Sequence, residues 1–145
     1  MKYYLSIIII IVLGSFIRVQ AQPAIGIHPF DKEFSVRTNL NKKQFWDFRT
    51  SFDFGYMQGY GYFKYRFEIS YNRRPLNAEQ IKLYYGVGLA VQDFMPQMVL
   101  PFGIEVFPIE SVKNFSIASE IIPTINFVYF AGLSLSTDIA FRYYF

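Results

Sequence analysis

The fold is decided by the last thirteen residues of the chain, LSLSTDIAFRYYF (residues 133–145). Apolar and polar side chains alternate here with a period of two, which predicts a β-strand with two different faces. The odd positions form an apolar face that becomes aromatic toward its end, with Ile139, Phe141, Tyr143 and Phe145. The even positions include the charges of Asp138 and Arg142. An exposed terminal Phe is unusual in water and is expected where the apolar face contacts lipid.

Seven earlier stretches alternate in the same way: residues 24–29, 33–40, 45–56, 62–71, 82–92, 98–108 and 115–127. Most of them approach the ~9–11 residues that a tilted strand needs to cross a bilayer. The first two are shorter and could instead form one bent strand. The connections are rich in Asn, Gly, Pro and Asp, as tight reversals require: 30–32, 41–43, 57–61, 72–80, 93–97, 109–114 and 128–132. The sequence therefore predicts an all-β fold, an eight-stranded antiparallel up-and-down transmembrane β-barrel.

Residues 1–21 differ from the rest of the chain and predict a cleaved signal peptide. Lys2 precedes a short apolar run, residues 5–17, and small or apolar residues precede Gln22. A membrane-anchoring helix is the alternative, but the apolar run stops at Arg18, short of the ~20 residues needed to span a bilayer. The expected organisation is therefore a signal peptide at 1–21 and a single barrel domain at 22–145.

Composition limits the classes of function. The chain is 52% hydrophobic and 21% aromatic, although no later apolar run reaches helix-spanning length. Loss of Lys2 and Arg18 would leave 12 basic and 11 acidic residues and lower the formal net charge from +3 to +1. This balance argues against a nucleic-acid partner. The absence of cysteine excludes a disulfide framework, a thiolate metal site and a lipid-modified cysteine, and the sequence contains no pattern for a metal or cofactor.

The size of the side chains predicts which face points inward. Large aromatics on almost every stretch could not all fill an eight-stranded interior, which is only just wide enough for side chains. We therefore expect the apolar face outside and the polar face inside. Mixed charges of low net sum tend to pair in a low-dielectric interior, so the expected result is a closed lumen rather than a pore. The predicted lumen charge network consists of Arg37, Asp47, Arg49, Asp53, Lys64, Arg66, Glu68, Glu105, Glu120, Asp138 and Arg142.

With this pattern in every stretch, the mature chain resembles the small OmpX- or OmpA-type outer-membrane β-barrels. The resemblance implies a place in the outer membrane of a Gram-negative bacterium, in contact with its lipid and lipopolysaccharide. It also implies that the last strand is recognised by the barrel-insertion machinery, through Ile139, Phe141, Tyr143 and Phe145. The chain lacks the long extracellular loops of that family, so an adhesive role is not carried over.

The turns suggest a partner. With both termini in the periplasm, four connections face outward, and they are unusually apolar for loop tips in water. Contiguous apolar patches commonly mark interaction sites, here Phe30, Met57, Phe94, Met95, Tyr129 and Phe130. We therefore expect a non-enzymatic barrel that is a structural element or an accessory subunit beside another outer-membrane or surface protein.

Two alternatives remain open. The only histidine, His28, is expected on the inner face beside Ser134 and Ser136, with Asp138 and Glu33 nearby. A Ser-His-acid set is the minimum for acyl transfer, and outer-membrane lipid A deacylases and palmitoyltransferases resemble this arrangement. No nucleophile elbow or oxyanion-hole motif accompanies it. The second alternative is a soluble lipocalin-like binder, with its apolar face inside.

Overall fold

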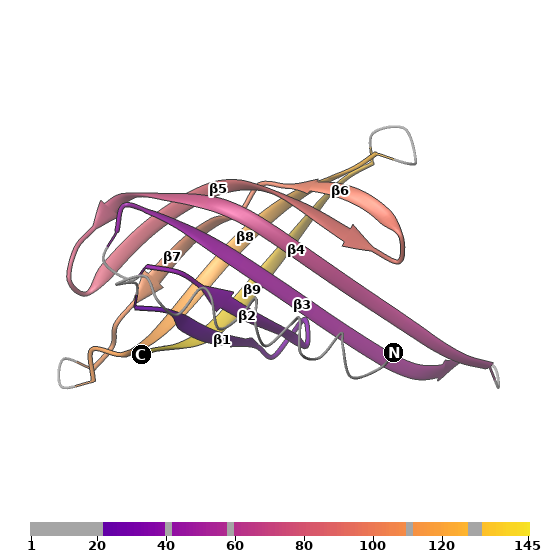
Figure 1. The fold of residues 1–145 in the computed structure, drawn as a ribbon, viewed down its shortest axis with the longest axis horizontal. Helices are drawn as coiled ribbons and strands as arrows, with labels where there is room; N and C mark the ends of the chain where they lie inside the picture. Colours follow the sequence, from indigo (N-terminus) through magenta and orange to yellow (C-terminus); the bar gives the residue numbers. More distant parts are fainter. Residues whose placement is uncertain (1–21, 40–41, 58–59, 110–111, 128–131) are drawn as a thin grey trace, which may run out of the picture.

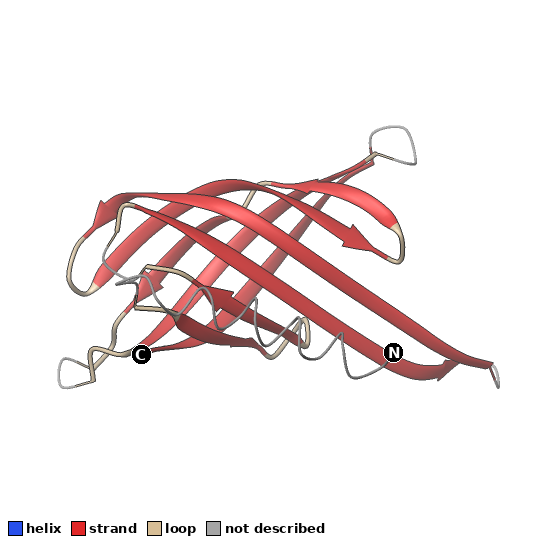
Figure 2. Cartoon of the chain, viewed as in Figure 1, coloured by secondary structure: helices blue, strands red, loops and turns tan. Residues whose placement is uncertain are grey.

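The computed structural model describes residues 22–39, 42–57, 60–109, 112–127 and 132–145. The predicted signal peptide lies outside these residues. In this part of the chain the fold consists of strands and connections (Figures 1 and 2). No helix in the described ranges is both long and apolar enough to cross a membrane. The strands are β1 (Ala24–His28), β2 (Glu33–Arg37), β3 (Gln44–Met57), β4 (Tyr60–Asn77), β5 (Ile81–Gln92), β6 (Met95–Val99), β7 (Phe102–Val106), β8 (Phe115–Asn126) and β9 (Gly132–Tyr144).

The strands form one antiparallel sheet that closes into a ring. β1 pairs with both β2 and β9, and the sheet continues from β2 through β3 and β4 to β5. β6 and β7 both lie between β5 and β8, so the nine strands occupy eight positions around the ring. The predicted all-β class and the number of positions are confirmed. β1 and β2 are two separate antiparallel strands rather than one bent strand.

The prediction of one continuous strand at residues 98–108 is wrong. Pro101 has no N–H to contribute to a ladder, and the strand is interrupted there. The residues at the interruption remain hydrogen-bonded to the strands on both sides. Leu100 N donates to the carbonyl of Pro123 in β8 at 2.9 Å, and Gly86 N of β5 donates to the carbonyl of Pro101 at 2.8 Å. The alternation continues across the break, with Val99, Pro101 and Glu105 all buried. β6 and β7 together therefore occupy the place of a single strand between β5 and β8.

The predicted turn at residues 72–80 is also wrong. β4 continues to Asn77, and only residues 78–80 connect it to β5. Asn72 and Arg74 are buried there on the inner face. This segment has the composition of a turn but forms a strand. The segment before β3 stabilises it, since Arg74 N donates to the carbonyl of Lys43 at 2.7 Å. In the same way β6 begins at Met95, inside the predicted turn 93–97.

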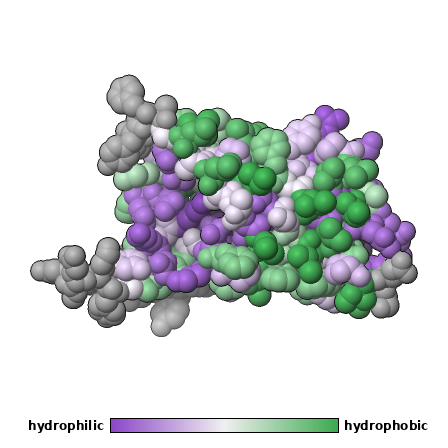
Figure 3. Space-filling view, turned by 180° about the vertical axis from the view of Figure 1, so that it is seen from behind, coloured by the Kyte–Doolittle hydropathy of each residue, from purple (hydrophilic) through white to green (hydrophobic). Residues whose placement is uncertain are grey.

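Burial is inverted relative to an ordinary globular protein. The largest fully buried side chains include Arg37, Arg74 and Arg142, whereas Phe54 and Leu133 are 75% and 74% exposed. On the face drawn in Figure 3, exposed apolar side chains form large patches beside a hydrophilic area. The predicted arrangement, with the polar face inside and the apolar face outside, is what the burial of successive residues shows.

The ring has two distinguishable ends. At the terminal end, Phe145 N donates to the carbonyl of Pro23 at 3.0 Å and Tyr144 N to that of Asn114 at 2.8 Å. Residues 38–39, 42–43, 78–80, 107–109 and 112–114, which are the described parts of the connections after β2, β4 and β7, share this end. At the opposite, hairpin end β3 is joined to β4, β5 to β6 and β8 to β9, whereas the β1–β2 turn points the same way but stops short of that end. The wall is uneven, because β1 and β2 have five residues each whereas β3 has 14 and β9 has 13.

Candidate functional site

The interior of the ring is filled by a buried charge network contributed by six strands. Strand alternation aims these side chains inward, because every second residue points to the same face. The arginines are Arg37 of β2, Arg49 of β3, Arg74 of β4 and Arg142 of β9, and the central carboxylates are Asp47 of β3, Glu105 of β7 and Glu120 of β8. All seven residues are at most 3% exposed.

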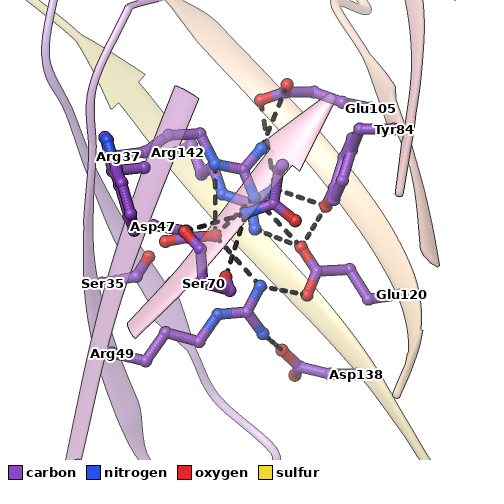
Figure 4. Close-up of polar contacts among 12 residues, drawn as sticks. Ser35, Arg37, Asp47, Arg49, Ser70, Tyr84, Glu105, Glu120, Asp138 and Arg142 are labelled. Atoms are coloured by element: carbon purple, nitrogen blue, oxygen red, sulfur yellow. Dashed lines mark hydrogen bonds and ion pairs between the residues drawn. The ribbon is translucent and has the colours of Figure 1, made fainter. Parts of the chain in front are cut away.

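Glu120 is the centre of this network (Figure 4). Its carboxylate lies 2.5 Å from Arg142 Nη2 and 3.3 Å from Arg37 Nη2, and it also contacts Arg49 Nη2. The hydroxyl of Tyr84 donates a further hydrogen bond to it. One carboxylate therefore joins strands β2, β3, β5 and β9 to β8.

The other two central carboxylates are shared in the same way. Asp47 Oδ2 accepts from Arg37 Nη2 at 2.6 Å and from Arg49 Nη2 at 3.0 Å. Glu105 Oε1 accepts hydrogen bonds from the hydroxyls of Ser116 and Tyr144, both at 2.6 Å. Charge-assisted hydrogen bonds of this kind offset the cost of burying the carboxylates.

Two buried aromatic rings separate the guanidinium groups. The Arg37 guanidinium lies 4.4 Å from the ring centre of Phe45 and 4.5 Å from that of Tyr84, and Arg74 lies 4.1 Å from Phe45. Cation–π attraction strengthens when the cation is removed from water. The sequence places Phe45 and Tyr84 on the polar parity, but nothing local to either residue indicates that it stacks against arginine.

Arg74 closes the network toward the terminal end. Its Nη1 donates to the backbone carbonyls of Asn39 at 2.6 Å and Lys42 at 3.0 Å. Sequence reasoning missed this residue because it assigned residues 72–80 to a turn. The signal that could have revealed it is the continued alternation of Ser70, Asn72 and Arg74 on one parity.

Above the central layer, His28 links β1 to β2 and β9. Its Nδ1 is hydrogen-bonded to the Asp138 carboxylate, and its Nε2 lies 2.9 Å from Ser35 Oγ. The expected proximity of His28 to Asp138 is present, but the expected serine partners are wrong. The hydroxyls of Ser134 and Ser136 donate instead to the backbone carbonyls of Thr124 at 3.5 Å and Ile122 at 3.3 Å.

Arg66 and Glu68 extend the polar interior along β4. Arg66 Nη2 lies 2.7 Å from Glu68 Oε2, and Arg66 Nε lies 3.7 Å from Glu33 Oε1. Among the residues described, no group of three or more His, Asp or Glu side chains is arranged to hold a metal ion.

Asp53 and Lys64 lie outside the buried network that the sequence predicts for them. Both have the inward parity, but they are near the hairpin end, where β3 and β4 extend past the short β2. Asp53 pairs with exposed Lys32 at 3.1 Å, and Lys64 lies 5.5 Å from the ring centre of Tyr62. Asp53 and Lys64 pair with each other's strand, but β2 ends at Ser51 of β3 and β5 ends at Arg66 of β4, so no strand continues on their other sides and both side chains reach solvent.

The remaining predicted residues lie on the outer surface or at the turns. The expected insertion-signal residues, Ile139, Phe141, Tyr143 and Phe145, all point outward and are exposed. Of the expected partner-contact residues, Phe30, Phe94 and Met95 are exposed, and the ring of Phe94 packs edge-on against that of Tyr65 at 5.3 Å. Met57 ends β3, and Tyr129 and Phe130 lie outside the described residues.

A cavity of about 690 Å³ opens at the terminal end, lined in part by Glu79, Lys82, Phe107 and Lys113. Lys113 donates a 2.6 Å hydrogen bond to Glu79, which lowers the pKa of that exposed carboxyl. Lys82 lies 4.8 Å from the ring centre of Phe107. The lining therefore mixes both signs of charge and shows no single-sign surface for an ionic ligand.

Comparison with known protein families, curated proteins and solved structures finds no match to this chain.

The network predicts a large effect from a single uncharged replacement. Glu120→Gln keeps the shape of the side chain but leaves the buried arginines short of one negative charge. Breaking a buried ion pair from one side costs about 3–5 kcal/mol. We expect a loss of that size in the free energy of unfolding, measured by urea titration of the folded protein through the fluorescence of its single tryptophan, Trp46.

The matched control is Glu79→Gln, which removes an exposed carboxyl that pairs with Lys113 at the surface. Its unfolding midpoint is expected to match that of the native protein, because solvent screens exposed pairs. Equal stability of the two variants would show that Glu120 is not the centre of the network.

Proposed function

We propose that this chain is an integral β-barrel protein of the outer membrane of a Gram-negative bacterium, made with a cleaved signal peptide at residues 1–21. The inverted burial carries the proposal. Buried arginines inside and exposed Phe, Leu and Ile side chains outside fit a wall whose outer solvent is lipid and whose interior is polar. A soluble lipocalin-like binder would need the opposite arrangement.

Strand length and aromatic placement support the same proposal. β3, β4, β5, β8 and β9 each have 12–18 residues, enough for a tilted strand to cross a bilayer. Near the terminal end Trp46 packs against Tyr71 at 5.0 Å, and Tyr143 against Phe145 at 5.2 Å, all on the outer surface. Aromatic residues of this kind form girdles at the membrane interfaces of such barrels. We further propose that Ile139, Phe141, Tyr143 and Phe145 present the insertion signal.

The proposed role is structural, as an accessory subunit of a larger envelope assembly. The charges of the lumen are already paired with one another, and aromatic rings fill the space between them. An eight-stranded ring leaves no aqueous channel once its side chains are packed. Paired charges therefore close the lumen, and the outer wall and turns are left to make contacts with lipid, lipopolysaccharide and protein.

If the outer surface contacts lipid, a charged side chain placed on it should destabilise the inserted barrel, although a water-exposed surface would tolerate the same charge. Leu89 is 61% exposed on β5, between Ile69 of β4 and Met98 of β6. Arg on the lipid face near the midplane costs about 2–4 kcal/mol in β-barrels. Leu89→Arg should therefore lower the amount of heat-modifiable protein recovered from the outer-membrane fraction.

Phe94→Arg is the control, because Phe94 is 87% exposed in the β5–β6 turn at the hairpin end, where the chain would meet water. Its recovery should equal that of the native protein. A protein found in the soluble fraction, with both variants equally well folded, would exclude the membrane proposal.

A second candidate function, an acyl hydrolase, rests on one observation. Ser35, His28 and Asp138 are joined in the order that nucleophilic serine catalysis uses, with Nε2 toward the serine and Nδ1 toward the acid. However, Ser35 is 2% exposed and His28 is fully buried, so a substrate carbonyl has no open path to Ser35 Oγ. We therefore propose that these residues form a structural link between β1, β2 and β9.

A fluorophosphonate probe separates the two roles, because it labels serines activated by a histidine. We expect the folded protein and a Ser35→Ala variant to give the same background signal. Labelling of the native protein that is absent from Ser35→Ala would favour the hydrolase.

The apolar turns at the hairpin end provide a test of the subunit role. Phe94 is 87% exposed and has a positive φ of 67°, in a two-residue turn that projects it outward. If another outer-membrane or surface protein binds there, Phe94→Ser should reduce the amount of that protein recovered with a tagged copy in mild detergent. The control is Lys113→Ser at the opposite end, and recovery unaffected by Phe94→Ser would remove Phe94 from the contact.

A further inference from the structure

A small cavity at the terminal end combines basic and aromatic side chains. Its volume is about 280 Å³, and it is lined by Asn39, Lys42, Lys43, Gln44, Phe45, Trp46 and Tyr71. None of these lining residues is acidic. The acidic residues that follow in the sequence, Asp47 and Glu79, are already paired with Arg37 and Lys113. Unlike the larger cavity at this end, this one therefore presents positive charge alone, and it favours an anionic ligand.

The order of side chains along β3 and β4 follows the layers of a phospholipid leaflet. Three opposed pairs face outward, and toward the terminal end they are Phe48 with Ile69, Trp46 with Tyr71, and Gln44 with Arg73. Successive pairs are two residues apart, so the surface changes from apolar to aromatic to cationic within about 14 Å. Trp and Tyr rings prefer the level of the lipid headgroups. The cations beyond them are then at the level of the phosphates.

Buried Arg74 fixes the segment that carries the two lysines. Its Nη1 donates to the carbonyls of Asn39 and Lys42, and its backbone N donates to the carbonyl of Lys43. The side chains of Lys42 and Lys43 are exposed. A backbone that is already held in place lowers the cost of ordering a site when a ligand binds.

The β9 side of the terminal end has aromatic rings but a different arrangement of charge. Tyr143 and Phe145 are exposed there and pack against each other at 5.2 Å. Lys113 donates to Glu79, and Arg142 is buried against Glu120. An anion is therefore attracted more strongly to the β3–β4 side.

We propose that this cavity binds the headgroup of an anionic phospholipid. This proposal rests on the membrane location proposed above, with the terminal end on the periplasmic side, where an outer membrane has a phospholipid leaflet. Lys42, Lys43 and Arg73 bind the phosphate through charge-assisted hydrogen bonds. The rings of Trp46 and Tyr71 pack beside the glycerol and the first carbons of the acyl chains.

The size of the cavity suits a headgroup rather than a whole lipid. Pockets that enclose drug-sized ligands measure roughly 300–1,000 Å³, and this cavity, at about 280 Å³, lies just below that range. The acyl chains therefore remain outside it, along the apolar outer face of β3 and β4.

The charges of the lining favour an anionic headgroup over a zwitterionic one. A zwitterionic headgroup brings an ammonium group close to Lys42, Lys43 and Arg73, and no acidic side chain of the lining can accept it. An anionic headgroup such as phosphatidylglycerol has no ammonium group. Its glycerol hydroxyls can instead hydrogen-bond to the side-chain amide of Gln44.

Trp46 provides a direct readout, because it lines the cavity and is the only tryptophan in the chain. The protein is purified from outer membranes and placed in vesicles of equal amounts of phosphatidylglycerol and phosphatidylethanolamine. Brominated acyl chains, which quench tryptophan on contact, are carried by one lipid in the first preparation and by the other in the second. We expect stronger quenching by brominated phosphatidylglycerol. An enrichment of about fivefold beside Trp46 corresponds to the ~1 kcal/mol of one cation near an anionic lipid surface.

Two triple variants test whether the cavity causes this selectivity. Lys42→Gln/Lys43→Gln/Arg73→Gln should be quenched equally by both lipids. The matched control, Lys32→Gln/Lys64→Gln/Lys113→Gln, loses the same charge from exposed sites elsewhere and should keep the selectivity of the native protein. All six side chains are exposed, so both variants are expected to fold, and heat-modifiable migration checks this.

The outcomes separate the lipid site from the membrane proposal. Equal quenching of the inserted native protein by both lipids would overturn the lipid site alone. The same would follow if selectivity persisted in the first variant or disappeared in the control. Selectivity should also survive inorganic phosphate at constant ionic strength, and its loss there would show a site for phosphate ions instead of lipid. A chain absent from the outer-membrane fraction would overturn the membrane proposal itself.

Discussion

The structure depends on the pairing of charges that it buries. Four arginines and the central carboxylates are almost completely buried, and an unpaired charge there would strongly destabilise the folded chain. Glu120 meets this constraint for three arginines at once, on three other strands. The network therefore forms only when the ring is closed, since β9 and β2 bring Arg142 and Arg37 to the same carboxylate.

The outer surface is the counterpart of this interior. Because successive residues in a strand point to opposite faces, each inward charge is flanked by outward side chains, and these are mostly Phe, Tyr, Leu, Ile and Val. An interior of charges cannot drive folding through the hydrophobic effect. In the proposed setting the lipid receives the apolar surface, and the network mainly specifies which strands meet.

The short β1–β2 hairpin is the exception to this regular wall. It supplies Arg37 and the His28–Ser35 pair to the interior, so closure of the ring depends on it. It ends before the neighbouring strands do, which leaves the long edge of β9 without a partner among the described strands. The same segment thus completes the network and leaves parts of β3 and β9 without a neighbouring strand.

The sequence by itself determined the faces, because a period of two needs no knowledge of neighbouring strands. Alternation predicts the all-β class, the eight wall positions and the inward parity of Asp47, Glu105, Glu120 and Arg142, which the structure has on the inside. It fails where composition imitates a turn, as at Arg74, and where proline divides a wall position, as at Pro101.

Only the tertiary structure decided which inward residues meet. Partners on different strands depend on register and on the closure of β1 against β9, whereas a period of two gives only the face on which each residue lies. For this reason His28 bonds to Ser35 across the hairpin rather than to Ser134 or Ser136. For the same reason Asp53 and Lys64 reach solvent although they share the parity of the network: their strands extend beyond the neighbour that would have enclosed them.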